Sequence, residues 1–393
     1  MEIVIAVFDL AAAGGVERDA ARVARALIDR GHHARIYSTS VGPFADGIPT
    51  TILPARGLTN HGRMAAFAND LERAVHRRRQ LIVGFQKLTG LDVLYCGDWC
   101  FAERRRPWLF PRYQGMWKLE EACCGPQSKT FLLMLSQPQA DAYRRAWSIA
   151  PERMVVLPPT LDSRRLLVPP TKLEREELRR SRGIKENQNA WLWIGLQPQV
   201  KGLDRVLNAL ALVPDAVLLV AGVDPAHKRA RRLFEKAGRR GCRDRIIPVG
   251  RVDHATLDSL LGACDLLVHP ARLDVTGTVI VEALGASVPV VTTANCGYAA
   301  HVSASGAGIV LPPNASASMI AEAAAVVKDR RMSFSKLAHD YVSTTELTTG
   351  IDVAATVIEE VAKLAPALHS PLPPPASGKA LVGDRGQHNA GSI

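Results

Sequence analysis

Residues 269–293 contain one complete α/β unit: HPARLDVTGTVIVEALG (269–285) runs directly into ASVPVVTT (286–293). A loop of small residues, from Val275 to Thr278, leads into an apolar segment with the length of a short helix. Pro289 interrupts that segment, and the β-branched run after it is typical of a buried strand. Helix, breaker and apolar strand together predict the alternating architecture of an α/β fold.

The same stretch has the features of an anion-binding site. Thr276, Gly277 and Thr278 fall at the predicted start of the helix, where unpaired backbone N–H groups and the helix dipole favour a diphosphate. Glu282 lies on the same side of the helix as Thr278, and its carboxylate can accept hydrogen bonds from ribose hydroxyls. On spacing alone, a core helix capped by Asp274 explains the pattern equally well.

Strand and turn patterns elsewhere predict two Rossmann-like domains. The apolar run 3–7 precedes a Gly14-Gly15 turn and a long amphipathic helix, and residues 191–195 restart the same pattern. A chain of 393 residues with 47% hydrophobic composition is long enough for two cores. We predict α/β domains over 1–160 and 161–345 with a hinge near Pro158, a helix within 346–365, and a disordered tail over 366–393.

Composition narrows the functional classes. The formal net charge is +11, and basic runs at 77–79, 104–106 and 228–245 predict attraction to polyanions, although solvated helix faces explain most of these arginines. A nucleic-acid-binding protein is the alternative that this charge raises, but the charge is scattered and no recognition module accompanies it. The seven cysteines form no disulfide or metal-ligand framework. Without a signal peptide or a run of ~20 apolar residues, a cytosolic protein is expected.

Several motifs in a fixed order carry a family resemblance. Asp274 and Glu282, followed by helix, proline and a Val-Val strand, resemble the donor signature of the retaining glycosyltransferases of family 4. Within that family, NCGYA (295–299), TNHGR (59–63), GFQK (84–87) and GLDV (90–93) resemble the lipopolysaccharide-core glucosyltransferases that act on the inner-core heptose. The likeness covers the chain up to Leu364. It implies the GT-B fold, in which two Rossmann-like domains face each other across a cleft and a C-terminal helix crosses back to the first.

The resemblance assigns donor-binding roles. Lys201, in GLQPQVKG (195–202), matches the family's phosphate-binding lysine, whose ammonium would neutralise charge on the departing diphosphate. Val200 replaces the usual arginine beside it, so Arg165 gains importance as a phosphate contact. Arg251 matches the loop that frames the nucleobase, although a lone arginine is more often a surface charge. The other implied donor contacts are Gly15, Thr276, Gly277, Thr278, Glu282 and Asp274, which stands where the family has glutamate and would bind a sugar hydroxyl.

Two acids are candidates for orienting or partly deprotonating the acceptor hydroxyl. Asp19 follows the GGVER turn (14–18) and Asp98 lies in CGDWC (96–100), each after a first-domain strand, where ligands collect in α/β sheets. The family motif surrounds Asp98, whereas Asp19 equally suits a helix cap. The resemblance also implies His61 and Lys87 as contacts for acceptor phosphates.

A basic and aromatic segment is a candidate membrane contact. Arg104, Arg105 and Arg106 precede Trp108, and Trp117 follows on a predicted helix. Cations beside aromatic rings suit the headgroup region of an anionic bilayer. On pattern alone, an amphipathic core helix is the better explanation. The resemblance favours the membrane, because this segment corresponds to the part of these glucosyltransferases that contacts the inner leaflet.

These features predict retaining transfer of a hexose, glucose from UDP-glucose being the expected donor, to lipid A-linked heptose at the cytoplasmic face of the inner membrane. No protein nucleophile is evident, and the family implies a front-face reaction in which the leaving diphosphate draws the acceptor proton. The helix start and Lys201 stand in for an Asp-x-Asp metal site, so no metal, cofactor or nucleic acid is expected. Two alternatives stay open: another membrane glycolipid or polysaccharide carrier as acceptor, and a sugar-nucleotide-binding protein without catalysis.

Overall fold

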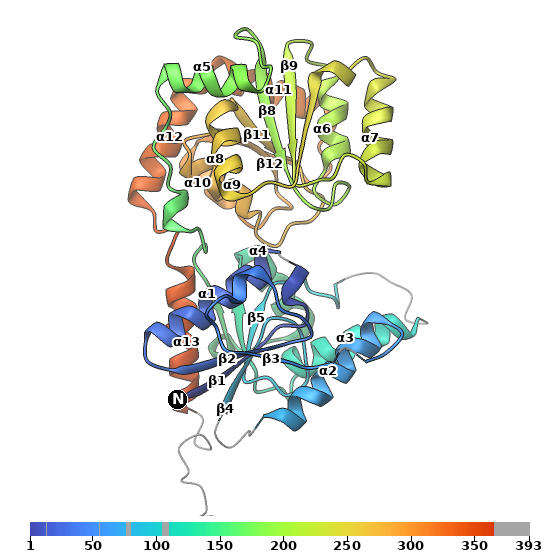
Figure 1. Cartoon of the computed structure of the whole chain (residues 1–393), viewed down its shortest axis with the longest axis vertical. Helices are drawn as coiled ribbons and strands as arrows, with labels where there is room; N and C mark the ends of the chain where they lie inside the picture. The colour runs from blue at the N-terminus through green and yellow to red at the C-terminus, as the bar shows by residue number, and fades with distance from the viewer. Residues whose placement is uncertain (13, 55, 76–79, 104–109, 365–393) are drawn as a thin grey trace, which may run out of the picture.

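Two α/β domains are stacked along the long axis of the molecule (Figure 1). The computed structural model describes residues 1–364 apart from 13, 55, 76–79 and 104–109. Each domain has one parallel sheet with helices on both faces, as the sequence predicted. The predicted tail over 366–393 lies outside the described residues.

The first domain is built on a sheet with strand order β3-β2-β1-β4-β5-β6-β7. Its strands are β1 (Glu2–Ala6), β2 (His33–Ser38), β3 (Thr50–Ile52), β4 (Gln80–Gly84), β5 (Val93–Cys96), β6 (Phe131–Met134) and β7 (Met154–Val156). The central strand β1 pairs with β2 and β4, so that Ile5 lies opposite Ile36 and Val83. These inner strands are apolar on both faces because helices cover both sides of the sheet.

The helices that follow these strands are α1 (Gly15–Asp29), α2 (Asn60–Ala74), α3 (Pro111–Cys124) and α4 (Gln137–Trp147). Helix α1 begins at the carboxyl end of β1, where the Glu17 carboxylate accepts the Gly14 N–H at 3.0 Å. Such a bond satisfies one of the amides that a helix start leaves unpaired. Helices α2 and α3 project together to one side of the domain (Figure 1).

The second domain repeats the design with strand order β10-β9-β8-β11-β12-β13. Its strands are β8 (Asn189–Ile194), β9 (Ala216–Ala221), β10 (Ile246–Gly250), β11 (Leu266–His269), β12 (Val290–Thr293) and β13 (Gly308–Leu311). Its helices are α5 (Lys172–Ser181), α6 (Leu203–Leu210), α7 (Lys228–Gly238), α8 (His254–Ala263), α9 (Thr278–Gly285), α10 (Ala299–Ser305), α11 (Ala317–Asp329) and α12 (Arg331–Thr344). All residues of β8 are buried, Trp191 and Trp193 among them.

Two chain crossings join the domains. The first (157–162) follows β7, and the second (345–349) leads from α12 to α13 (Gly350–Leu364). They are hydrogen-bonded to each other, because Leu161 N–H donates to Leu347 O at 3.0 Å and Gly350 N–H donates to Pro159 O at 3.1 Å. A Cβ on Gly350 would overlap the carbonyl oxygen of Pro158, so glycine is needed where the crossings touch.

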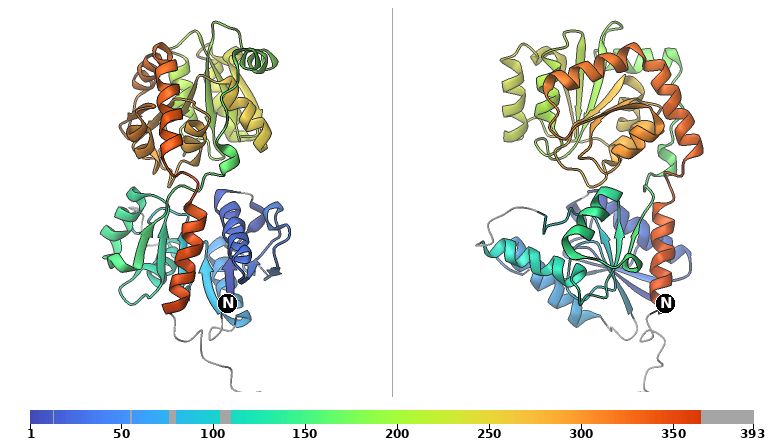
Figure 2. Two further views of the ribbon diagram at one scale, coloured as in Figure 1. Left: turned by 90° about the vertical axis from the view of Figure 1, so that its left-hand side faces the viewer. Right: turned by 180° about the vertical axis from the view of Figure 1, so that it is seen from behind.

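Helix α13 packs against the first domain, beside α1 (Figure 2). Ile351, Ala354 and Ile358 are buried in the first domain's core, and Arg30 Nη1 lies 3.1 Å from Glu359 Oε2 at its surface. The predicted return of the C-terminal helix to the first domain is therefore observed. No helix among the described residues is both long and apolar enough to span a membrane, and all seven cysteines are buried without a disulfide.

Candidate functional site

Asp274 is the centre of a buried polar cluster at the carboxyl end of β11. Its Oδ2 lies 2.7 Å from Lys201 Nζ and 2.8 Å from His269 Nε2, and its Oδ1 accepts the Gly277 N–H at 3.0 Å. His269 ends β11, and the loop that follows carries Asp274 back beside it. Hydrogen bonds between Asp274 and segment 295–297 hold the backbone of that loop. Strand and loop together thus fix the positions of the acid and its partners.

Lys201 reaches this cluster from the loop between β8 and α6. Gly202 has a φ of 76°, which favours glycine, and a Cβ there would overlap the carbonyl oxygen of Pro270. Arg272 N–H donates to Val200 O at 2.8 Å. The two loops are therefore in contact, which places the ammonium of Lys201 at the Asp274 carboxylate.

The charges in this cluster support one another. Burial alone would lower the pKa of His269, but the hydrogen bond to Asp274, with help from Cys296, raises that pKa to about 9. Burial would likewise raise the pKa of Asp274, but His269 and Lys201 hold it well below its usual range. At neutral pH the cluster is thus a carboxylate between an imidazolium and an ammonium.

The start of α9 offers amides to an anion, with one correction to the prediction. Gly277 is its N-cap with a φ of 77°, and its N–H is not unpaired, because Asp274 accepts it. The amides of Thr276 and Thr278 donate to no described residue. The Glu282 side chain is buried in α9, and no described residue donates to its carboxylate. Two amides and one carboxylate are therefore free to contact a ligand.

Asp98 is exposed on the loop after β5, whose backbone is held by hydrogen bonds. Gln139 Nε2 donates to the carbonyl oxygen of Asp98 at 2.7 Å. The loop packs on the first turn of α1, since a Cβ on Gly97 would overlap the Val16 side chain. Asp98 thus stands beside the start of α1 at the carboxyl edge of the first sheet.

Asp19 is buried in the second turn of α1, which rules out the helix-cap alternative. Its Oδ2 accepts hydrogen bonds from the hydroxyls of Tyr95, at 2.8 Å, and Thr160, at 3.2 Å. Burial raises the pKa of Asp19, and the neighbouring guanidiniums of Arg18 and Arg22 oppose that rise. Asp19 therefore ties α1 to β5 and to the first chain crossing.

The carboxyl edges of the two sheets meet at the domain boundary (Figure 1). Ser136, at the start of α4, donates its hydroxyl to Val275 O in the second domain at 2.6 Å. A Cβ on Gly297 would overlap both Val275 O and Ser136 Oγ. Residues that follow strands of both domains therefore face the same boundary, where ligands bind in open α/β sheets.

Comparisons with known proteins match this arrangement. The family Glycosyl transferases group 1 matches residues 174–346. The lipopolysaccharide glucosyltransferase WaaG of Escherichia coli (strain K12) is 32% identical over 362 residues, which cover 88% of this chain and 95% of that protein. This chain belongs to the group 1 glycosyltransferases.

Solved structures of related glycosyltransferases agree with this assignment. A crystal structure of WaaG, a glycosyltransferase involved in lipopolysaccharide biosynthesis, is 30% identical with a TM-score of 0.81, covering 91% of this chain and 99% of that one. Anabaena Alr3699/HepE in complex with UDP-glucose shares the fold, with 17% identity, a TM-score of 0.73, and coverage of 93% and 100%. The resemblance inferred from the sequence and the GT-B fold are thus confirmed.

Three further predicted residues of this glycosyltransferase lie outside the Asp274 cluster. Gly15 begins α1, and an added Cβ would meet no atom within 4 Å, which leaves room for a ligand. Arg251 is exposed on the loop between β10 and α8. His61 lies in the first turn of α2, with Nε2 3.3 Å from Thr59 Oγ1. Contacts with donor or acceptor stay predictions for all three.

Two predicted phosphate contacts are already engaged elsewhere. Arg165 is buried, forms an ion pair with Asp258 of α8 and donates to His254 O at 3.2 Å. Only Nη1 makes these contacts; Nε and Nη2 are buried without a partner among the described residues, so a diphosphate contact would have to reach these two nitrogens. Lys87 is only 3% exposed, and its Nζ lies 2.6 Å from Glu120 Oε2. An acceptor phosphate cannot reach that ammonium in this structure, so the role predicted for Lys87 needs correction.

The predicted membrane segment is described only in part. Arg104, Arg105, Arg106 and Trp108 lie outside the described residues. Trp117 is half-buried in α3, and its ring centroid lies 5.2 Å from that of Trp147. Trp117 therefore also packs in the first domain, as the core-helix alternative expects.

Two buried polar side chains of these clusters were not predicted from the sequence. His269 ends an apolar strand just ahead of Asp274, and a polar side chain at that place is a signal for a partner of the acid. Glu120 is buried among the apolar positions of α3 beside Leu119 and Cys123. An acid in such a helical stripe signals a buried ion pair, but not which cation supplies it.

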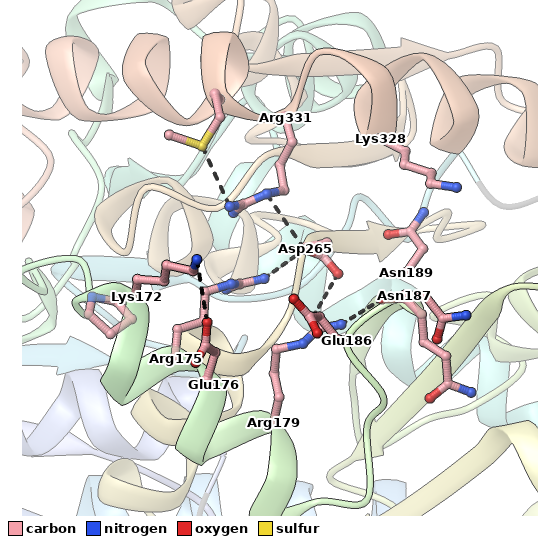
Figure 3. A pocket seen from close by; sticks show the side chains of 13 residues that line it. Lys172, Arg175, Glu176, Arg179, Glu186, Asn187, Asn189, Asp265, Lys328 and Arg331 are labelled. Atoms are coloured by element: carbon pink, nitrogen blue, oxygen red, sulfur yellow. Dashed lines mark hydrogen bonds and ion pairs between the residues drawn. The ribbon is translucent and has the colours of Figure 1, made fainter.

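A cavity of about 730 Å³ in the second domain is separate from this site (Figure 3). Asn189 and Asp265, which line it, lie at the amino ends of β8 and β11, opposite the edge that carries Lys201 and His269. Asp265 is neutralised there by Arg175 at 2.6 Å and Arg179 at 2.9 Å. Its position separates this cavity from the Asp274 cluster.

Stability should depend on pH through His269. A histidine whose pKa rises from 6.5 to about 9 on folding adds stability that is complete below about pH 6.5 and is lost as the pH rises through about 9. The contribution is on the order of 3 kcal/mol. His269→Gln should therefore lower the free energy of unfolding, measured in urea, more at about pH 6 than at about pH 10. An equal loss at both pH values would contradict a charged His269.

Proposed function

We propose that this glycosyltransferase moves a hexose from a UDP-sugar, with UDP-glucose as the expected donor, to a heptose of the lipopolysaccharide inner core with retention of configuration. The contact of Lys201 with Asp274 carries the proposal, because Asp274 joins this cation to the loop whose Thr276 and Thr278 amides have no partner among the described residues. Similarity to the lipopolysaccharide glucosyltransferase of Escherichia coli over 95% of that protein supports the acceptor class.

The chain itself supplies the positive charge for the diphosphate. Lys201 Nζ and the amides of Thr276 and Thr278 would bind phosphate oxygens, so no metal ion is required. Glu282 would accept the ribose hydroxyls, and Arg251 would frame the nucleobase. When phosphate oxygens compete for Lys201, the Asp274 carboxylate keeps His269 and gains a free lone pair for a sugar hydroxyl.

The transfer step needs no protein nucleophile. The bond between sugar C1 and the β-phosphate oxygen breaks while C1 bonds to the acceptor oxygen on the same face. The acceptor proton passes to the leaving phosphate oxygen, so atoms and charge balance. Lys201 and the α9 start stabilise the charge that grows on the phosphate. Asp98 orients the acceptor hydroxyl, whereas the buried Asp19 supports the crossing that it contacts.

We further propose that the enzyme acts as a peripheral protein on the cytoplasmic face of the inner membrane. Its proposed acceptor is anchored in lipid. The cationic and aromatic residues Arg104, Arg105, Arg106 and Trp108 directly precede α3 in the chain, and α3 projects from the first domain (Figure 1). Such side chains suit an anionic headgroup layer.

Purified enzyme with UDP-glucose and lipid A-linked heptose should give an α-glucosyl product, identified by mass spectrometry and NMR. Other UDP-sugars are expected to react more slowly, and a chelator should leave the rate unchanged. If the enzyme turned over only with another glycolipid, that glycolipid would be the acceptor in place of the heptose. A lack of turnover with every donor, combined with UDP-sugar binding, would instead indicate a binding protein without catalysis.

Lys201→Ala should lower kcat by about 10- to 100-fold, because the ammonium stabilises charge that develops mainly in the transition state. UDP affinity, measured by calorimetry, should fall much less. Lys185→Ala, which removes an exposed lysine beyond α5, is the matched control. An unchanged kcat in Lys201→Ala would refute this role.

A further inference from the structure

The Glu120 carboxylate, fully buried in α3, is the centre of a second polar cluster. It accepts hydrogen bonds from Lys87 Nζ at 2.6 Å and from Trp147 Nε1 at 2.9 Å. It also accepts the backbone N–H groups of Phe101 at 2.6 Å and Ala102 at 2.8 Å. One side chain of α3 thus joins the end of β4, helix α4 and the loop after β5.

The partners of Glu120 concentrate on residues 98–102, which we call the acceptor segment. Lys87 Nζ donates to Trp99 O at 3.2 Å, and Glu120 binds the amides of Phe101 and Ala102. Gln139 Nε2 also donates to the carbonyl oxygen of Asp98. Hydrogen bonds therefore hold the segment at both ends. The Asp98 side chain is exposed and makes none of these supporting bonds.

Burial makes this pair sensitive to the loss of either charge. Both side chains are at most 3% exposed, and a buried charge without its partner is strongly destabilising. The Lys87 ammonium and the hydrogen-bond donors around Glu120 outweigh burial and lower the pKa of its carboxyl group. Both groups therefore stay charged, and each fixes the other's position.

We propose that the Lys87–Glu120 pair positions the acceptor segment and so makes α3 part of the acceptor site. The inference rests on the proposed function, in which Asp98 orients the acceptor hydroxyl. Neither residue touches substrate; both act through the backbone of residues 99–102.

Glu120→Gln keeps the shape of the side chain and removes its charge. We expect the KM for the heptose acceptor to rise about tenfold or more, while UDP affinity and the slow hydrolysis of UDP-glucose by water stay near wild-type values. Asp265→Asn is the matched control, because Asp265 also accepts from two arginines and a backbone amide, but at the far edge of the second domain (Figure 3). It should lower the melting temperature and leave the acceptor KM unchanged.

A second variant and a second readout keep the inference testable. Lys87→Gln should raise the acceptor KM in the same direction, and the double variant should show less than the sum of the two effects. Hydrogen exchange at the amides of Phe101 and Ala102 should quicken in Glu120→Gln and not in Asp265→Asn, whatever the acceptor proves to be. An unchanged acceptor KM with unchanged exchange, or equal changes in both variants, would overturn the inference.

A separate observation concerns the surface of α7. Lys228, Arg229, Arg232, Lys236 and Arg239 are exposed and make no ion pair with any described residue. The apolar residues of α7, such as Phe234, face the core. Beside the helix, Arg231 and Arg243 line a cavity of about 190 Å³. The exposed face of α7 is cationic and presents no large apolar side chain that could insert into a bilayer. It therefore suits electrostatic contact with an anionic surface.

The orientation of α7 favours a bilayer as that surface. Helix α7 forms the edge of the second domain on the side to which α2 and α3 project from the first (Figures 1 and 2). We infer that α7 is a second contact with anionic phospholipid, resting on the proposed membrane location. Contacts on both domains would lay the long axis of the molecule along the membrane.

Replacing Lys228, Arg232, Lys236 and Arg239 with Gln should weaken binding to phosphatidylglycerol vesicles at least tenfold, since each cation contributes roughly fivefold before screening. Neutral phosphatidylcholine vesicles should bind neither form. The control, matched in formal charge, replaces Lys172, Arg180, Lys185 and Lys336, which belong to or adjoin α5 and α12 on the opposite side (Figure 1). Two of these, Lys172 and Lys336, form ion pairs within their own helices. The inference would be overturned if both variants lost vesicle binding equally. It would also be overturned if the α7 variant kept vesicle binding but no longer bound to immobilised DNA.

Discussion

The carboxylate of Asp274, held between two cations and a helix amide, is the interaction on which the donor half of the molecule depends. A buried acid is tolerated only when its hydrogen-bonding capacity is filled, and here Lys201, His269 and the Gly277 N–H fill it. The same bonds hold the loops after β8 and β11 together without a ligand. In the proposed function, a UDP-sugar would therefore meet preformed charge, and its binding would redistribute hydrogen bonds instead of creating the site.

Glu120 is the corresponding buried acid of the first domain. In both domains a buried acid fixes a loop at the carboxyl end of a parallel strand. Asp274 is accessible to a ligand through Lys201, which is 25% exposed, whereas Glu120 is sealed from solvent. The first acid is suited to contact with substrate, and the second to support.

Much of the architecture could be predicted from the sequence, because apolar periodicity records which faces are buried. The strand at 191–194, the helix after Gly277 and the final helix follow this pattern.

The contacts of charged side chains are harder to predict from the sequence. Asp274 and Lys201 were assigned separate ligands, but their contact arises only when two distant loops pack. Lys87 and Asp19 lie within motifs that suggest ligand contact, and motif position does not reveal that tertiary packing buries both. Glu120 belongs to no motif, and its partner Lys87 is distant in the chain, on the loop after β4.

The paired crossings between the domains have a mechanical consequence. A single linker would let one domain twist, slide and tilt against the other. Two segments, joined by the bonds of Leu161 to Leu347 and Gly350 to Pro159, instead form a two-stranded hinge. Such a hinge favours rotation of one domain relative to the other about a single axis and resists twisting between the domains. Opening would then separate Ser136 from Val275 along a reproducible path, so that each closure returns the two sheet edges to the same alignment.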